Sequence, residues 1–398
     1  MEGLIGTPVL LGGFALAVVL GAMASLTHFC TMGGLSDWVN IGDRSRMGAW
    51  LVAVAVSLIA VTLLEARGAI DLGTTRPPYR SPVLAWPRHL LGGLLFGIGM
   101  VLASGCPTKN LVRLGNGSLK ALTALLAAAA MAWLMTRAGL YGYLFHGWIQ
   151  PLTLDLGARG FQGQDLGSLL GGVAGLPVAT LRLLSAMLLA LGLLLWVWRR
   201  SDIRPGHLLG GVMIGLCVAG GWYLTGGPWG QAWQEEALWL AQPPAGVGTQ
   251  SFTFVNPLAE MLTLVASGGS LRWLTFGVVA VAGVVLGACG HALVAGRFRL
   301  EGFRRLDDLL RHLGGGALMG LGGILALGCT IGQGVTGVST LALGSLLTLG
   351  AIILGATATL RAQYYRMLYD DARLLDVLLS TGADLRLLPA RWRRLEWL

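Results

Sequence analysis

Long runs of apolar residues, separated by short polar connectors, organise the whole chain. Each run is near the length of about 20 residues that an α-helix needs to cross the hydrocarbon core of a bilayer. The pattern predicts membrane helices over 8–28, 46–66, 89–104, 118–137, 179–197, 207–225, 273–295, 312–327 and 340–358. The stretch 138–178 is broken by Gly and Pro and gives no clear element. We therefore expect an all-α polytopic membrane protein with about nine or more membrane helices.

The connectors between these runs are basic or aromatic. Pro- and Arg-rich connectors lie at 67–88 and 199–206, and 228–257 is rich in Trp and Pro, as is typical of a membrane interface. The tail 361–398 is amphipathic and is expected on the cytoplasmic surface. The Arg cluster of 297–311 predicts a cytoplasmic position for that segment, which leaves 67–88 outside if the halves are inverted.

An internal repeat divides the chain. Residues 88–106 align without a gap to residues 311–329, with 12 identical positions of 19 that include Arg-His at the start and Gly-Cys at the end. We predict a first membrane half over 1–200, a second half over 201–360 and the amphipathic tail over 361–398. A fainter pair is His28 at the end of the first helix with His291 near the end of 273–295. Each is expected to precede a charged interfacial helix, over 37–46 and 297–311.

The two repeated segments are short for membrane helices. The apolar part of each has 16 residues, about 24 Å against a hydrocarbon core of about 30 Å. Broken helices in corresponding halves mark the binding site of many transporters. We expect inverted repeats with short, re-entrant helices that end at Gly-Cys and meet near the middle of the membrane.

Composition and charge exclude other classes. Only 12% of residues are charged, 55% are hydrophobic and the mean hydropathy is +0.70, which is far from a soluble globular protein. The net charge of +9 comes from Arg clusters between apolar runs rather than from a basic stripe with interleaved aromatics, so no nucleic-acid partner is expected. The five cysteines have neither a disulfide framework nor a zinc spacing, and neither a metal nor another cofactor is expected.

The repeated thiols are the candidate chemistry. Cys106 and Cys329 end the two repeats, each after a glycine (Gly105 and Gly328), and Cys30 ends the first helix. A path lined by S–H groups and glycine N–H groups suits a soft, sulfur-bearing anion. Three polar residues just beyond the Gly-Cys pairs are candidate donors to the anion, with helix-end capping as the alternative: Lys109, Asn110 and Gln333. Cys217 and Cys289 lie inside apolar runs and are expected to be packing residues.

The motifs His28-Phe-Cys30, Gly105-Cys106-Pro107 and Gly328-Cys329 resemble those of the YeeE/YedE family of bacterial inner-membrane proteins, the sulfur transport family. The resemblance covers nearly the whole chain. It implies an hourglass-like helical fold with inverted repeats in the inner membrane, and uptake of thiosulfate or a related anion. Cys30, Cys106 and Cys329 would then relay the anion through S–H···S contacts without covalent chemistry. The resemblance also implies a small cytoplasmic sulfur-carrier protein, TusA-like, as a partner.

Two alternatives stay open at this stage. One is a membrane-embedded thiol enzyme, a sulfurtransferase that forms a persulfide; a Cys of that kind needs a neighbouring base or cation, and His89 and His312 are 17 residues away from Cys106 and Cys329. The other is a transporter of a selenium or another sulfur compound. The favoured prediction is a transporter and not an enzyme.

Overall fold

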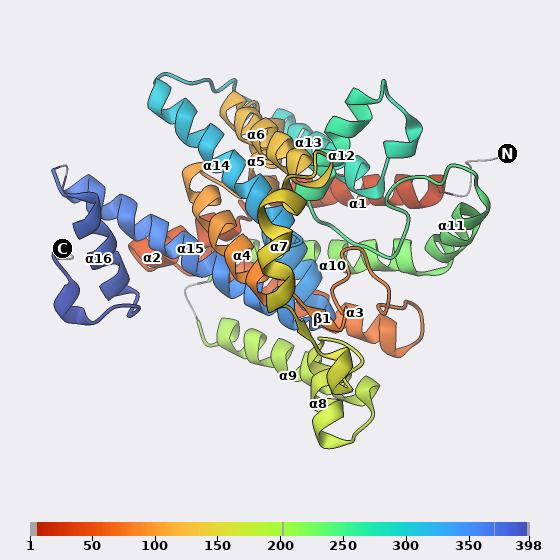
Figure 1. Ribbon diagram of the computed structural model, residues 1–398. Coiled ribbons are helices and arrows are strands. Elements are labelled where there is room, and N and C mark those ends of the chain that lie inside the picture. The colour runs from red at the N-terminus through yellow and green to blue at the C-terminus, as the bar shows by residue number, and fades with distance from the viewer. Residues whose placement is uncertain (1–5, 201–202, 370, 396–398) are drawn as a thin grey trace.

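The computed structural model describes residues 6–200, 203–369 and 371–395, and it is almost entirely helical (Figure 1). Long helices occupy all nine of the predicted segments: α1 (Thr7–Leu26), α3 (Ser45–Ala66), α4 (Trp86–Leu102), α6 (Leu119–Thr136), α9 (Val178–Trp198), α10 (Pro205–Gly226), α13 (Phe276–Val294), α14 (Leu306–Leu325) and α15 (Leu343–Leu368). Within the described ranges, 8 helices are long and apolar enough to cross a membrane. Helix α14 is the exception, because its first turns carry Asp307, Asp308 and Arg311. The protein is an all-α polytopic membrane protein, as predicted.

Shorter elements connect these helices. The helical ones are α2 (Thr31–Ile41), α5 (Pro107–Gly115), α7 (Gly147–Ile149), α8 (Leu166–Ala174), α11 (Pro228–Trp239), α12 (Val255–Ala266) and α16 (Leu374–Asp384). Strands β1 (Val83–Leu84) and β2 (Leu154–Asp155) form one small antiparallel pair. A π-helical turn over Gly332–Gly337 and a 3₁₀ turn over Val338–Thr340 precede α15. In Figure 1, α16 and α11 lie at opposite ends of the molecule.

The two repeated helices, α4 and α14, pack directly against each other. A Cβ atom added to Gly92 would lie 2.7 Å from the carbonyl oxygen of Gly322, and one added to Gly99 would lie 2.6 Å from that of Gly315. Gly92 aligns with Gly315 in the repeat and Gly99 with Gly322, so the contacts are reciprocal, as in a two-fold interface. Helices α4 and α14 therefore run antiparallel, and glycine lets their backbones touch.

The flanking helices repeat the same relationship. Gly97 of α4 lies against the backbone of Ile352 in α15, and the equivalent Gly320 of α14 lies against Ala128 in α6. Each repeated helix is thus held between its counterpart and the helix that follows the counterpart's short segment. This packing on two sides fixes the C-terminal ends of α4 and α14, which Cys106 and Cys329 follow.

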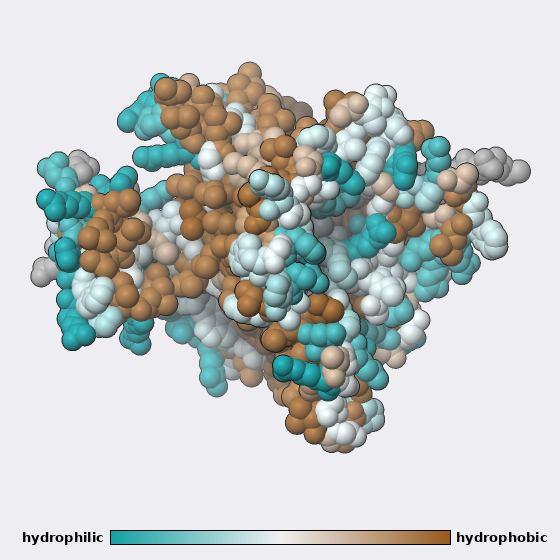
Figure 2. Space-filling view, in the orientation of Figure 1, coloured by the Kyte–Doolittle hydropathy of each residue, from teal (hydrophilic) through white to brown (hydrophobic). Residues whose placement is uncertain are grey.

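Apolar side chains cover the outside of the helices. Leu184, Leu188, Leu191 and Leu195 of α9 are all exposed, and they form a face suited to lipid. Figure 2 shows brown, apolar surface over α14, α4 and α15, with hydrophilic side chains gathered toward α16 and toward α11. This distribution matches the predicted membrane setting.

The structure corrects three predictions about local structure. Helix α14 begins at Leu306 and has 20 residues, so only α4, with 17, is short. The predicted interfacial helix over 297–311 is wrong for residues 297–305, because backbone groups of Arg299 and Glu301 bond to Asn116 and Gly117 instead of forming a helix. Helix α12 lies in a region where no helix was predicted.

The predicted domain limits remain predictions. The boundary between 200 and 201 falls beside residues 201–202, which lie outside the described part of the chain, as do 1–5, 370 and 396–398. Helix α15 continues through the limit at 360/361 to Leu368, and the amphipathic part of the tail is α16.

Candidate substrate path

Each of the three cysteines follows a helix end of the same shape. The residue two positions before each cysteine has a left-handed backbone: His28 (φ 54°), Ser104 (φ 56°) and Leu327 (φ 61°). Such a conformation costs a residue other than glycine on the order of 1 kcal/mol or more, and it persists where the surroundings fix it. The same strained turn, used three times before a cysteine, indicates a shared role for these positions.

In each of these turns a backbone N–H group bonds to the carbonyl oxygen five residues earlier. The bonds run from Phe29 N to Ala24 O (3.1 Å), from Gly105 N to Met100 O (2.8 Å) and from Gly328 N to Gly323 O (2.8 Å). This is the six-residue bond of the Schellman motif, which ends a helix sharply. The chain then turns, and the cysteine becomes the residue before the next helical segment.

The predicted pairing of His28 with His291 is wrong. His291 lies inside the last turn of α13, where its Nδ1 is 3.0 Å from the Ser25 hydroxyl. The residue after α13 that shares the left-handed conformation of His28 is Gly296 (φ 62°). The second half has no cysteine two residues later, since Phe298 occupies that place.

The three thiols lie at helix N-termini and are buried. Cys30 is the N-cap residue of α2, and its sulfur accepts a hydrogen bond from Gly33 N at 3.1 Å. Cys106 is the N-cap residue of α5, and the Cys329 sulfur accepts from Gly332 N at 3.4 Å. Their exposed fractions are 4%, 2% and 0%. Helix N-termini present unpaired N–H groups and positive potential, which favour an anion.

The cysteines of the two halves meet at the centre. The Cys106 thiol lies close enough to interact electrostatically with both Cys30 and Cys329, and it lies beside the Thr330 hydroxyl. Thr330 directly follows Cys329, so the start of each short segment contacts the other across the α4–α14 pair. The structure thus brings together the three cysteines that the sequence singled out.

The glycines before the central cysteines leave room for the turn. A Cβ atom on Gly105 would lie 2.9 Å from Cγ of Lys109, and one on Gly328 would lie 3.1 Å from Cγ of Gln333. Both glycines are buried beside their cysteines. A larger residue at Gly105 would displace the Lys109 side chain, and one at Gly328 would displace the Gln333 side chain.

The three candidate donors occupy different places. The amide groups of Asn110 and Gln333 are fully buried and donate to backbone carbonyl oxygens, of Gly105 at 2.8 Å and of Ala326 at 2.6 Å. These bonds are the helix-end capping that the sequence left open as the alternative. Lys109 is half-buried, and its charge acts on the exposed His28.

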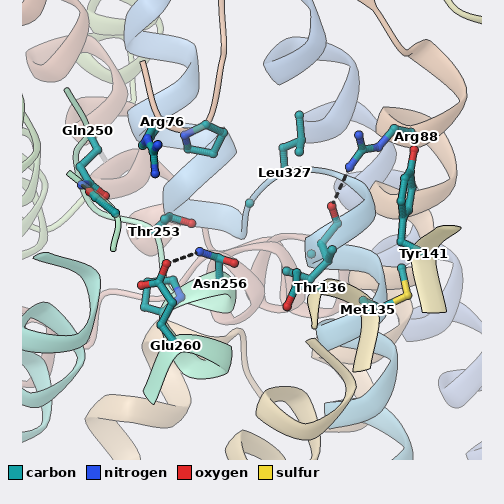
Figure 3. A pocket seen from close by; sticks show the side chains of 16 residues that line it. Arg76, Arg88, Met135, Thr136, Tyr141, Gln250, Thr253, Asn256, Glu260 and Leu327 are labelled. Atoms are coloured by element: carbon teal, nitrogen blue, oxygen red, sulfur yellow. Dashed lines mark hydrogen bonds between the residues drawn. The ribbon is translucent and has the colours of Figure 1, made fainter. Parts of the chain in front are cut away.

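A cavity of about 510 Å³ opens toward Cys329 from one side. Its inner wall includes Leu327 and Gly328, directly before Cys329, and also Thr253. Figure 3 shows Arg76, Gln250 and Thr253 on one side of the cavity, with Arg88 and Tyr141 on the other. The Arg88 guanidinium lies 4.6 Å from the Tyr141 ring and donates to the Ile324 carbonyl at 3.2 Å. Arg76 and Arg88 favour an anion here, although one carboxylate, Glu260, lines the same cavity.

Basic side chains also gather near His28 and Cys30. His28 is exposed, and the positive charges of Lys109, Arg297 and Arg46 act on it. Arg46 pairs with Asp37 at 2.5 Å and interacts electrostatically with Cys30. We call His28, Arg46, Lys109 and Arg297 the basic rim. It lies beside Cys30 and Cys106, whereas the cavity lies at the turn before Cys329.

Comparison with known proteins identifies the family of the chain. The family described as sulphur transport matches residues 26–358, a range that contains all three cysteines, the basic rim and the cavity. The chain belongs to the sulphur transport family. It is 27% identical over 352 residues to a protein of Spirochaeta thermophila named thiosulfate transporter TsuA, which covers 86% of this chain and 96% of the relative. It is 26% identical over 352 residues to the protein of that name from Escherichia coli K12, covering 82% of this chain and 86% of the relative.

Membership of the sulphur transport family indicates a membrane transporter and not an enzyme. All five cysteines are free thiols. Cys217 is buried in α10 and Cys289 is half-buried in α13, away from the turns that carry the other three. In the described ranges, there is no group of three or more His, Cys, Asp or Glu side chains that could hold a metal ion.

Sequence reasoning missed two residues beside the thiols of this family member. Thr330 directly follows the repeated cysteine Cys329, and this position in the sequence is a signal that could have identified it. Thr253 lies beside Cys329 from the extended segment before α12, and its Oγ1 would be 2.4 Å from a Cβ atom on Gly332. No local motif marks Thr253, because its position depends on a contact between distant parts of the chain.

Proposed function

We propose that this protein imports thiosulfate across the bacterial inner membrane along the path from the cavity through Cys329, Cys106 and Cys30 to the basic rim. The observation that supports this most is the meeting of buried thiols at the N-termini of short helical segments from both repeats. The naming of two relatives as thiosulfate transporters supports the choice of anion.

Thiosulfate fits the chemistry of this path. It carries negative charge, which helix N-termini and the arginines of the cavity and the basic rim favour. Its terminal sulfur is soft and polarizable, and a thiol both donates weakly to such a sulfur and contacts it favourably. The anion would pass from one S–H group to the next by non-covalent S–H···S contacts, so no sulfur changes its oxidation state.

The direction of transport follows from the proposed topology. The antiparallel contact of α4 with α14 supports inverted repeats that enter the membrane from opposite sides. The arginines of 297–311 favour a cytoplasmic basic rim, and the cavity with Arg76 would then face the periplasm. A small cytoplasmic sulfur-carrier protein of the TusA-like kind would receive the intact anion at the basic rim.

The test is uptake of thiosulfate labelled in its terminal sulfur into liposomes that contain only this protein. We expect saturable uptake that unlabelled thiosulfate competes away and sulfate does not. Liposomes with the Cys106→Ala, Cys329→Ala double variant serve as the control. Uptake equal to that of the double variant, or preference for a selenium anion, would refute thiosulfate as the substrate.

A second measurement separates relay from covalent transfer. Intact-mass analysis of the protein after incubation with thiosulfate is expected to give the unmodified mass. A reductant-sensitive increase of about 32 Da, one sulfur atom, on the Cys106 or Cys329 peptide would replace the relay by a persulfide mechanism.

A further inference from the structure

Several buried polar atoms along the path have no hydrogen-bond partner. Within the described ranges, these include the hydroxyls of Thr108, Thr253 and Thr330 and the Oε1 atom of Gln333. All four residues lie beside or just beyond Cys106 and Cys329 in sequence or in space. Burying a hydroxyl without a partner is unfavourable, and native proteins rarely leave one without a reason.

Thr330 is the most deeply placed of these hydroxyls. Its side chain is fully buried, and Oγ1 faces the Cys106 thiol without forming a hydrogen bond of ordinary geometry to any described group. A threonine in a helix usually bonds to the carbonyl four residues earlier, as Thr357 does with Ile353 at 2.7 Å. Thr330 opens a new helical segment directly after Cys329, so the carbonyl four residues earlier, of Ala326, belongs to the end of α14 and accepts from the Gln333 amide instead. The hydroxyl is therefore left available at the thiol.

Thr253 occupies the matching place one step nearer the cavity. Its side chain is 9% exposed, it lines the cavity wall, and its hydroxyl lies beside the Cys329 sulfur. The absence of a side chain at Gly332 allows this close approach, since a Cβ atom there would lie 2.4 Å from Thr253 Oγ1. The Cys329 thiol is within reach of this hydroxyl, and among the described residues no nitrogen or oxygen atom is hydrogen-bonded to it.

The path thus contains two successive pairs of a thiol and an unpartnered hydroxyl. The first pair is Cys329 with Thr253, and the second is Cys106 with Thr330. In each pair a soft sulfur lies beside a hard O–H donor. An anion with one soft sulfur and several hard oxygens matches both members of a pair. Sulfate has no soft sulfur for the thiol, and hydrosulfide has no oxygen for the hydroxyl.

We propose that the Thr253 and Thr330 hydroxyls bind the sulfonate oxygens of thiosulfate while Cys329 and Cys106 bind its terminal sulfur, so that the two pairs select for an anion with both ends. This inference rests on the proposed function. It assigns the oxygen-binding groups at the same two positions where the thiols act, and it explains why these buried hydroxyls have no protein partner.

The test uses Thr253→Val and Thr330→Val, which keep the shape of the side chain and remove the donor. Thiosulfate uptake into liposomes is expected to fall roughly ten- to hundredfold for either variant, the effect of losing a hydrogen bond to a charged group. Thr330→Ser should restore most of the rate. Thr357→Val, whose hydroxyl bonds within its own helix, is the matched control and should transport normally.

Thermal stability gives an independent readout. Replacing an unpartnered buried hydroxyl by a methyl group should leave the melting temperature unchanged or raise it. Unchanged uptake in both valine variants, or a slower uptake that only accompanies a lower melting temperature, would overturn the inference. Absence of thiosulfate uptake by the unaltered protein would instead overturn the proposed function.

Discussion

Asn110 and Gln333 hold equivalent positions in the two repeats, and each clamps the end of its own helix. The side-chain amide of Asn110 donates to Gly105 O at 2.8 Å, and that of Gln333 donates to Ala326 O at 2.6 Å. Both side chains are fully buried and lie four residues after the central cysteine. The two amides therefore hold the turns that aim Cys106 and Cys329 toward each other.

Removing one of these clamps should destabilise the protein. Asn110→Leu or Gln333→Leu would leave a buried carbonyl oxygen without its donor, at a cost of about 1–3 kcal/mol in the free energy of unfolding. Thermal unfolding in detergent measures this loss. Asn40→Leu is a suitable control, because Asn40 is exposed and bonds only to Ser36. Equal melting temperatures for the Asn110 and Asn40 variants would contradict the clamping role.

The cysteines should fall into three classes. We expect Cys106→Ala and Cys329→Ala to reduce thiosulfate uptake to background, because each removes a central thiol. Cys30→Ala, at the basic rim, should lower the rate about three- to tenfold, the effect of losing one weak hydrogen bond. Cys217→Ala and Cys289→Ala are the controls and should transport normally. Full uptake by the Cys106→Ala, Cys329→Ala double variant would eliminate the thiol path.

Neighbouring glycines of α14 should respond in opposite ways to alanine. A Cβ atom on Gly315 would lie 2.6 Å from the backbone nitrogen of Ala103, whereas one on Gly314 would have nothing within 4 Å. Gly315→Ala should cost about 1–3 kcal/mol through overpacking of the α4–α14 contact. Gly314→Ala should gain up to about 1 kcal/mol from the better helix propensity of alanine. The melting temperatures of the two variants give the comparison; the same sign for both would mean that α4 and α14 do not pack as described.

Labelling can test the proposed orientation. Thr74 and Arg304 are both exposed and lie at opposite ends of the path, on the segments that carry Arg76 and follow Arg297. In a background without other cysteines, a cysteine at position 74 should react with an impermeant maleimide from the periplasm, and one at position 304 only after the membrane is opened. Labelling of both from the same side would rule out inverted repeats.

Acid should weaken the attachment of α8 and α9 to the rest of the protein. Asp165, outside the spanning helices, is fully buried; burial alone would raise the pKa of its carboxyl, but hydrogen bonds from Arg182 and Ser168 outweigh that effect and lower the pKa. A lowered pKa means that this carboxylate stabilises the fold fully above its unfolded value of about 3.9 and that the stabilisation is lost as the pH falls through the folded value.

The matching variant is Asp165→Asn, which removes the charge but keeps the size. It should destabilise the protein at neutral pH by about 1.5–3 kcal/mol, because Arg182 loses its charged bonds to Asp165 while it keeps the pair with Glu65 at 3.3 Å. Its melting temperature should also fall less between pH 6 and pH 3 than that of the unaltered protein. Identical pH dependence of the two proteins would show that Asp165 does not contribute through its charge.

The sequence by itself determined the class of fold and the central chemistry. Segments of apolar residues long enough to span a bilayer left helices as the main solution, because backbone groups in lipid must bond internally. The shared Arg-His start and Gly-Cys end of the repeat identified Cys106 and Cys329, since a repeated local motif can be detected within one sequence.

Only the tertiary structure decided what surrounds the thiols. Thr253 reaches Cys329 from an extended segment 76 residues earlier, and Thr330 reaches Cys106 from the other half of the molecule. The helix expected over residues 297–305 does not form, because its backbone bonds to residues 116 and 117 instead. Periodicity and motifs record local preferences, whereas these contacts depend on how α4 and α14 cross. A single sequence carries no direct signal of that crossing, so the hydroxyls beside the thiols became visible only in the folded protein.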